Sequence, residues 1–236
     1  MLIGMGKTYE NRTLGTYGKS GCKIAFVPIH KNAHTWGVEF FSVNYGLTKL
    51  ENLSADERDS LAHIVFLRDP IERWYSGAVQ FLIATYFKDM PDSREVVLDD
   101  ATLKFMFSAV RLDAHTDIQR RYIMNLNIFH TLFFNTDDDQ FYFKLTNWLD
   151  IDGYRYNLEK LDKNHISVDP INQSGDSKLK IRLIQQLKNA AAKNTEYLTN
   201  IKNFYRPDFE LLEYVSRFDH TKTTHRQLNK SYGNRI

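Results

Sequence analysis

The sequence has a single cysteine, Cys22, among its 236 residues. An internal disulfide and a cysteine-based zinc cluster are therefore excluded, and the low cysteine content fits a reducing compartment. Long apolar runs are also missing, because no stretch approaches the roughly 20 apolar residues that a membrane-spanning helix needs. The apolar part of residues 1–7 is too short for a secretory signal. We therefore expect a cytoplasmic protein without a membrane span.

The chain also lacks a strong charge imbalance. Its formal net charge is +2 at pH 7, which is too small to indicate wholesale binding of nucleic acid, so an anion-binding site would have to be local. No linker rich in Pro, Gly or Ser divides the chain, and 42% of its residues are hydrophobic, enough for a sizeable core. We expect one domain over residues 1–236, with flexible ends at 1–20 and 221–236.

Hydrophobic patterning predicts an α/β fold. Short runs of apolar and β-branched residues indicate strands, and apolar residues at helical spacing indicate helices. The predicted strands are 24–29, 63–67, 128–134 and 141–145, and the predicted helices are 36–46, 70–82, 101–110 and several from Ser177 to Phe218. Strands that alternate with helices favour a three-layer fold with a mostly parallel central sheet flanked by helices, which binds its ligand at the carboxyl ends of the strands.

The first candidate site follows the strand at 24–29. A polar loop comes next, and a helix continues to Gly46, a typical C-terminal stop. The N-terminus of a helix favours an anion, and loop N–H groups from residues 32–35 point toward it. Lys31 adds a cation and Thr35 adds a hydroxyl donor. We therefore predict a phosphate-binding loop.

The second candidate site follows the strand at 63–67. Asp69 is expected to cap a helix whose first residue is Pro70, so the helix start is well marked. Arg68 stands at the end of the strand, where its guanidinium can bind a phosphate, and Ser76 offers a hydroxyl donor. Arg73 is expected to join them, to pair with Glu72 or to face solvent. Because both strands are predicted to be parallel, both polar motifs should lie at the same edge of the sheet.

The first loop does not follow the Walker A pattern, in which lysine directly precedes the hydroxyl residue. Here Lys31 comes four residues before Thr35, and the loop contains no glycine. This loop, followed by the R-D-P-x-x-R-x-x-S motif that runs from Arg68 to Ser76, resembles the sulfotransferases that use 3′-phosphoadenosine 5′-phosphosulfate (PAPS). His34 stands where that family has a small residue before the threonine.

The resemblance implies a P-loop-like fold, PAPS as the sulfuryl donor, no essential metal, and a hydroxyl-bearing acceptor. In that family the first loop holds the 5′-phosphosulfate, whereas the strand-end arginine and the serine eight residues later hold the 3′-phosphate. Two further segments, 113–119 with its His and Gln and 204–211 with its Tyr-x-x-Asp, are similar to the carbohydrate sulfotransferase branch, which makes a carbohydrate the candidate acceptor. The expected nucleotide-binding residues are Lys31, Asn32, Ala33, His34, Thr35, Trp36, Arg68, Arg73 and Ser76.

Sulfuryl transfer to an alcohol needs a cation for the leaving oxygen and a base for the attacking hydroxyl. Lys31 is the candidate for the first role, because an ammonium aimed at the leaving oxygen stabilises the transition state. His115 is the preferred candidate for the base, because an imidazole takes up a proton near neutral pH. His34 and His30 are rivals, and Glu39 and Asp117 stay open as well.

Several other interpretations stay open at this stage. A P-loop kinase-like phosphotransferase is one, and a non-catalytic module that binds a nucleotide or a glycan is another. Trp36 is expected in the core, with stacking on an adenine as the alternative. His30 and His34 have the spacing of zinc ligands on a helix, but they straddle a loop, so no metal site is predicted. The acidic run 137–139 is expected to be a solvated turn.

Overall fold

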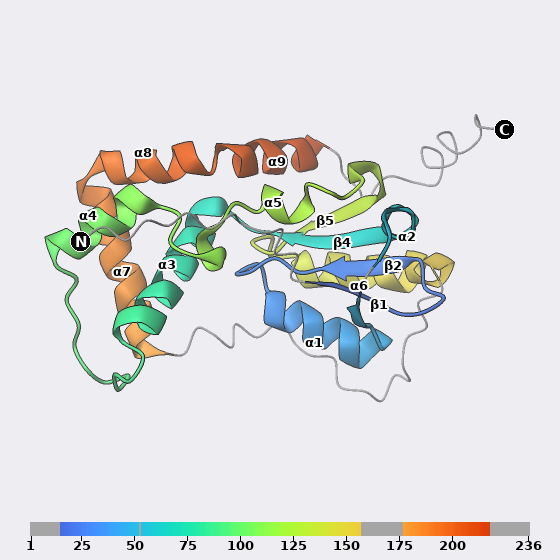
Figure 1. The fold of residues 1–236 in the computed structure, drawn as a ribbon, viewed down its shortest axis with the longest axis horizontal. Helices are drawn as coiled ribbons and strands as arrows, with labels where there is room; N and C mark the ends of the chain where they lie inside the picture. Colours follow the sequence, from blue (N-terminus) through green and yellow to red (C-terminus); the bar gives the residue numbers. More distant parts are fainter. Residues whose placement is uncertain (1–14, 52, 157–176, 218–236) are drawn as a thin grey trace.

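The computed structural model describes residues 15–51, 53–156 and 177–217, and these contain an α/β arrangement around one sheet. The strand order within them is β3-β1-β2-β4-β5 (Figure 1). The central strand β2 pairs in parallel with β4, and β4 pairs in parallel with β5, whereas β1 pairs antiparallel with β2 and β3. The strands are β1 (Thr16–Gly18), β2 (Ile24–Val27), β3 (Thr48–Leu50), β4 (Ala62–Leu67) and β5 (Thr131–Asn135).

The predicted α/β class is confirmed, and the sheet is mixed, with its parallel strands at the centre and on one side. Strand β1 lies inside the segment 1–20 that was expected to be a flexible end, so that prediction is wrong for residues 16–18. Residues 1–14 of the predicted N-terminal end lie outside the described residues, and so does the predicted C-terminal end, 221–236.

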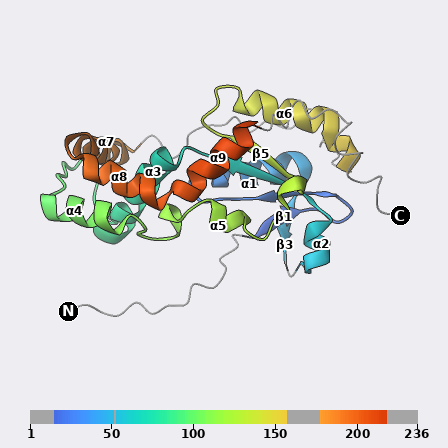
Figure 2. The same ribbon diagram turned by 90° about the horizontal axis from the view of Figure 1, so that it is seen from above.

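The two faces of the sheet carry alternate side chains, as the pleat of a strand requires. Ile24, Phe26, Ile64 and Phe66 point to one face and pack against α1 (His34–Tyr45) and α6 (Phe141–Asp152). Val27, Val65 and Leu67 point to the other face, where α5 (Arg120–Ile123) and α9 (Arg206–Arg217) cover them (Figure 2). The central strands are therefore enclosed by helices on both sides.

A second apolar core lies in a group of helices at the end of the sheet where β4 leads into α3 (Figure 1). It joins α3 (Pro70–Tyr86) to α4 (Asp100–Ala109), α7 (Lys178–Lys193) and α8 (Thr195–Phe204). Trp74 and Phe107 are fully buried in it and contact each other through their rings. The remaining short elements are α2 (Ala55–Asp59), η1 (Ala114–Thr116), η2 (Ile128–His130) and η3 (Gly153–Tyr156).

The ends of the two helices at the candidate site agree with the sequence signals. Gly46 ends α1 in the left-handed conformation, with φ of 65°, which glycine adopts readily. The carboxylate of Asp69 caps α3 by accepting the N–H groups of Ile71 and Glu72, and Pro70 is the first residue of that helix. Helix α1 follows β2 and helix α3 follows β4, so both helices begin beyond the carboxyl end of a parallel strand.

The predicted strand at 141–145 is wrong, because these residues open helix α6. The buried residues Phe141, Leu145, Trp148 and Leu149 recur at the spacing of one helix face, a pattern that a five-residue window is too short to reveal. The strand predicted from residue 128 begins only at Thr131, after the short helix η2.

His63 is a buried polar residue in the mostly apolar strand β4. It is fully buried in β4, opposite Ala25 of β2 and Thr131 of β5. Neither ring nitrogen of His63 has a hydrogen-bond partner. Burial, followed by the positive charge of Arg58, lowers the pKa of His63 to about 4, so the imidazole is neutral at pH 7.

Candidate functional site

The loop between β2 and α1 is shaped by two residues in the left-handed conformation. Lys31 has φ of 67° and Ala33 has φ of 52°. Such a conformation is unfavourable for residues other than glycine, and it is typically retained at functional sites. His34, which stands where the resembled family has a small residue, is the first residue of α1 and needs no positive φ. The loop therefore turns at residues 31 and 33, and α1 begins directly after it.

The side chain of Asn32 fixes this loop to the neighbouring strand. Asn32 is fully buried, and its Nδ2 donates to the carbonyl oxygen of Phe66 at 2.8 Å and to Oε1 of Gln119. Its backbone N–H donates to the carbonyl oxygen of Ile29 at 3.1 Å. Its N–H group is thus engaged within the turn and its side chain holds the loop in place, whereas the binding of a phosphate by this N–H group stays a prediction.

Gln119 holds the second loop as well as the first. Its Oε1 accepts the backbone N–H of Arg68 at 3.0 Å, and its Nε2 donates to the carbonyl oxygen of Arg68 at 2.9 Å. The carboxylate of Asp208 in turn accepts the N–H groups of Gln119 and Arg120 at 2.8 and 2.9 Å. One side-chain amide thus ties together the loops after β2 and β4, and helix α9 positions it.

Tyr205 and Asp208, the Tyr-x-x-Asp pair, act on this segment from within the protein. Tyr205 is fully buried, and its hydroxyl donates to the carbonyl oxygen of Thr116. Burial raises the pKa of Asp208, although its backbone hydrogen bonds oppose that shift. Both side chains hold residues 116–120, so their part in the site is to position the segment that carries His115 and Gln119.

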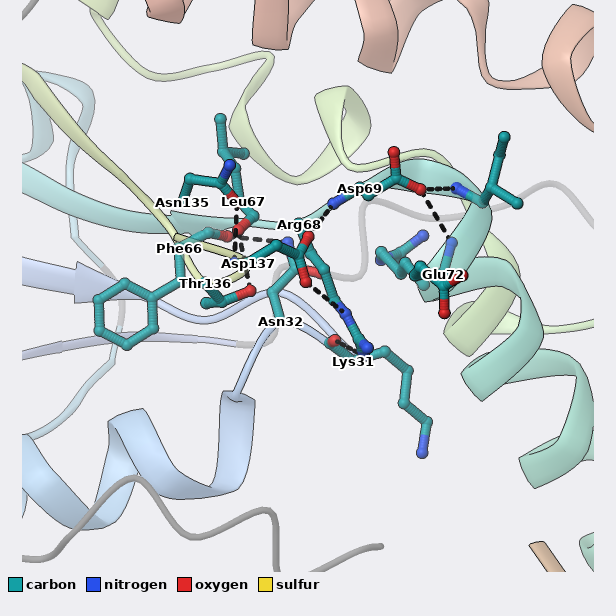
Figure 3. Close-up of polar contacts among 12 residues, drawn as sticks. Lys31, Asn32, Phe66, Leu67, Arg68, Asp69, Glu72, Asn135, Thr136 and Asp137 are labelled. Carbon is teal, nitrogen blue, oxygen red and sulfur yellow. Dashed lines mark hydrogen bonds and ion pairs between the residues drawn. The ribbon is translucent and has the colours of Figure 1, made fainter. Parts of the chain in front are cut away.

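Arg68 lies at the edge of the sheet, where its guanidinium contacts the first loop. Its Nη1 donates to the carbonyl oxygen of Lys31 at 3.4 Å, and its Nε forms an ion pair with Oδ1 of Asp137 at 3.3 Å (Figure 3). The other oxygen of Asp137 accepts the backbone N–H of Asp69 at 2.6 Å. The side chain of Arg68 remains 28% exposed, so it is accessible to a ligand.

Arg73 does not lie with Arg68 at the surface, nor does it pair with Glu72. It is fully buried, its Nε donates to the carbonyl oxygen of His30 at 2.9 Å, and its Nη1 donates to the carbonyl oxygen of Asp117. Two of its guanidinium nitrogens are thus used within the protein, Nη2 has no hydrogen-bond partner among the described residues, and the binding of a phosphate by Arg73 stays a prediction. Its guanidinium joins the first loop to the segment after η1, whereas Glu72 pairs with Lys188 of α7 at 2.7 Å.

Three histidines meet next to Lys31. The ring of His30 lies 5.3 Å from that of His34 and 4.6 Å from that of His115, measured between ring centroids. Burial and the neighbouring His115 lower the pKa of His30 to about 4, and the same two causes lower the pKa of His34. The three histidines among the candidate bases are thus in one cluster.

His115 differs from the other two because a carboxylate orients it. Its Nδ1 lies 2.9 Å from Oδ2 of Asp113, and its backbone N–H donates to the other oxygen of that carboxylate at 2.7 Å. Burial alone would raise the pKa of Asp113, but the hydrogen bond and charge of His115 outweigh it and lower that pKa. A hydrogen bond from Nδ1–H to a carboxylate leaves Nε2 as the proton acceptor. Asp113–His115 therefore has the arrangement of an oriented base.

Gly77 permits the close packing of η1 on α3. A Cβ atom at this position would lie 2.5 Å from the carbonyl oxygen of His115, closer than a Cβ atom can approach a nonbonded oxygen. Only glycine allows the backbone of η1 to approach α3 this closely. The position of His115 therefore depends on glycine at position 77 of α3.

The ammonium group of Lys31 lies in an electropositive and partly buried setting. Its Nζ donates to Oε1 of Gln80 on α3 at 3.3 Å. Burial first, and then the charge of Lys180 on α7, lower the pKa of Lys31 to about 8, while Asp113 opposes the shift. An anion bound here would relieve the repulsion among these cations.

The other predicted nucleotide-binding residues lie along α1 and α3. Thr35 is exposed in the first turn of α1, and Ser76 is partly buried in α3. Trp36 is only 8% exposed, and its ring packs against Phe40 and Phe66 in the core, the interpretation that the sequence favoured over stacking on an adenine.

Asp117 and Glu39, the two carboxylates among the candidate bases, are less suited to accept the proton of an acceptor hydroxyl. The carboxylate of Asp117 pairs with Arg111 at 2.8 Å and with Arg121 at 3.1 Å, so cations of the protein already surround it. Glu39 is exposed on α1. Within residues 15–51, 53–156 and 177–217, no group of three or more His, Cys, Asp or Glu side chains has an arrangement that could hold a metal ion.

Sequence reasoning missed three side chains of the site: Asp113, Gln80 and Asp137. Asp113 stands two residues before His115, a separation that lets a carboxylate reach Nδ1, and this signal was available. Gln80 and Asp137 are brought in by tertiary packing over 49 and 69 residues, and no local pattern marks them.

Comparisons with known proteins gave no relative: no family model, no curated protein and no solved structure matches the chain. In the described part of the chain, no helix combines the length and hydrophobicity needed to cross a membrane.

Proposed function

We propose that this chain transfers a sulfuryl group from PAPS to a hydroxyl group of an acceptor, with a carbohydrate as the candidate acceptor, on a P-loop-like α/β scaffold. The observation that carries the proposal is the meeting of two cationic loops at the carboxyl ends of neighbouring parallel strands, where Arg68 Nη1 contacts the carbonyl oxygen of Lys31 at 3.4 Å. The oriented pair Asp113–His115 lies beside them through its contact with His30. On the basis of the single cysteine, we place the reaction in the cytoplasm.

Two anion sites are required for a nucleotide with phosphate groups at both ends of its ribose. The N-terminus of α1, with the hydroxyl of Thr35, suits the 5′-phosphate, because the N-terminus of a helix favours an anion. Arg68 suits the 3′-phosphate, because a guanidinium forms strong charge-assisted bonds with phosphate oxygens. Ser76 stays a proposed donor to the same group.

The chemical step joins the acceptor oxygen to sulfur and breaks the bond between sulfur and the 5′-phosphate oxygen. The acceptor proton moves to Nε2 of His115, whose Nδ1–H is held by Asp113. The ammonium of Lys31 stabilises the negative charge that develops on the departing phosphate oxygen, an interaction that strengthens in the transition state. Bound PAPS supplies the activated sulfuryl group, and no oxidant or reductant is needed.

A magnesium-dependent phosphotransferase finds less support in these side chains. Such a reaction uses a strand-end carboxylate to hold the metal. Asp69 stands at the end of β4, but its carboxylate already accepts two N–H groups of α3. The carboxylate of Asp137 is engaged by Arg68 and by the N–H of Asp69.

Calorimetric titration of the wild-type chain with 3′,5′-adenosine bisphosphate, and separately with ATP plus Mg²⁺, tests the proposal. We expect the bisphosphate to bind and ATP to bind more weakly. Preference for ATP with magnesium would end the sulfotransferase assignment.

Two variants assign the roles of the cations. Lys31→Ala should lower the transfer rate at least a hundredfold, as the loss of one transition-state donor does elsewhere, while the bisphosphate still binds within about tenfold of wild type. Arg68→Ala should weaken binding of the bisphosphate about tenfold or more and leave 5′-AMP nearly unaffected. Lys202→Ala, at an exposed position on α8, is the matched control. Unchanged turnover in Lys31→Ala would contradict the mechanism.

A further inference from the structure

The acidic turn after β5 places a carboxylate on the very donors that we assign to a phosphate. Oδ1 of Asp137 lies 3.3 Å from Nε of Arg68, and Oδ2 lies 2.6 Å from the backbone nitrogen of Asp69. Figure 3 shows the Asp137 carboxylate between these two groups. A phosphate oxygen uses the same kinds of donor, a guanidinium edge and a backbone N–H next to a helix N-terminus.

We propose that Asp137 is a resident competitor, a carboxylate that occupies the Arg68 site in the free protein and that a phosphate monoester must displace to bind there. This inference rests on the proposed function, since it assigns the 3′-phosphate to Arg68. It makes Asp137 a residue that determines which anions the site accepts.

Displacement needs only a side-chain rotation, because the backbone of the turn is fixed by other bonds. Thr136 donates to the carbonyl oxygen of Leu67 through its N–H at 2.8 Å, and the N–H of Asp137 donates to Oδ1 of Asn135 at 3.0 Å. Asp138 accepts the N–H of Gln140 and pairs with Lys144. The carboxylate of Asp137 is thus free to leave Arg68 while the turn keeps its place.

The strength of the resident pair suits a displaceable contact. The side chains of Arg68 and Asp137 are 28% and 34% exposed, and solvent weakens ion pairs at such positions. A phosphate monoester carries up to two negative charges near neutral pH, against one on a carboxylate. The ligand phosphate therefore replaces Asp137 with a net gain, whereas a singly charged anion gains much less.

This arrangement predicts a mutation that improves binding. Asp137→Asn removes the competing charge, so the dissociation constant of 3′,5′-adenosine bisphosphate should fall about fivefold, the scale of a partly exposed ion pair. The dissociation constant of 5′-AMP, which lacks the 3′-phosphate, should not change. If Asp137 served only to hold Arg68 in its observed position, its replacement would have the opposite effect, because Arg68 would become less ordered and the bisphosphate would bind more weakly.

The experiment is calorimetric titration of wild type, Asp137→Asn, Asp137→Ala and the control Asp138→Asn with both nucleotides. Thermal melting verifies that each variant is folded, and Asp137→Ala repeats the test if the asparagine variant is not. Tighter binding of the bisphosphate alone in the Asp137 variants, with Asp138→Asn unchanged, supports the inference.

The other outcomes separate the two proposals. Selective binding of the bisphosphate by wild type, without a gain in the Asp137 variants, overturns the role of Asp137 and leaves the proposed function intact. An equal gain for both nucleotides also overturns it, because the effect is then not at the 3′-phosphate. Failure of every variant to prefer the bisphosphate over 5′-AMP overturns both proposals.

Discussion

His63 offers a test of the structure that does not depend on function. Its imidazole is fully buried and its two ring nitrogens have no partner, with a pKa of about 4 in the folded chain. In the unfolded chain a histidine has a pKa of about 6.5. The folded-state pKa is lower, so the unfolded chain binds more protons as the pH falls. The free energy of unfolding therefore keeps its full value above the pKa of the unfolded state and decreases as the pH falls toward the pKa of the folded state.

The size of this loss follows from the two pKa values. Relative to a pH well above 6.5, His63 should lower the free energy of unfolding by about 0.4 kcal/mol at pH 6.5 and by about 2 kcal/mol at pH 5. His63→Leu keeps a side chain of similar volume in the sheet and removes the titrating group. The variant should therefore lose less stability than wild type as the pH falls, although both also lose stability through other groups, His30 and His34 among them.

Urea unfolding of both proteins between pH 7.5 and pH 5 measures the effect. The charged neighbours of His63, namely Arg58, Asp59 and His130, are the same in both proteins, so the difference between the two curves isolates His63. A difference in unfolding free energy that stays constant across this range would refute the burial of a neutral His63.

Three further predictions concern the site. Gly77→Ala should push η1 away from α3, which should lower the free energy of unfolding by about 1–3 kcal/mol and displace His115 enough to lower the transfer rate. Urea unfolding and transfer kinetics measure the two effects, and a fully active, equally stable variant would argue against this packing. Binding of 3′,5′-adenosine bisphosphate should weaken as the pH rises above about 8, because the ammonium of Lys31 then loses its proton and no longer attracts an anion. Calorimetry at pH 7 and pH 9 measures this change, and equal affinity at both pH values would exclude Lys31 from the anion site. Asp208→Asn turns an amide donor toward one of two backbone N–H groups near Gln119 and should destabilise the fold by about 1–3 kcal/mol; a thermal melt like that of wild type would show that Asp208 is not the anchor of this segment.

The parts of the fold that the sequence predicted well depend on local signals. The cap formed by Asp69, Pro70 at the first position of α3 and Gly46 after α1 each act within one turn of a helix, so their meaning does not depend on distant residues. The buried strands β2 and β4 are also marked by their own composition. The position of both candidate loops at one edge of the sheet followed from these elements.

The sequence-based predictions that failed or were incomplete have a common physical cause: each depends on contacts with residues that are distant in the sequence or on a pattern longer than the segment considered. Arg73 was expected to join Arg68 and Ser76 or to pair with Glu72, but carbonyl oxygens more than 40 residues away in sequence accept its N–H groups. Asp137 was interpreted as part of a solvated turn, yet it reaches Arg68 across 69 residues. The segment 141–145 alternates in a way that suits a strand, and only its continuation to Leu149 reveals the helix.

The dependence of the site on Asp208 has a consequence for how the protein is made. The loops at Lys31 and Arg68 leave the ribosome before residue 208, but the amide that joins them, on Gln119, is anchored by a carboxylate from the last described helix. Synthesis proceeds from the N-terminus, so a nascent chain that has not yet exposed residue 208 lacks this anchor. The proposed anion site is therefore completed only after residue 208 has emerged, when its other residues are already outside the ribosome.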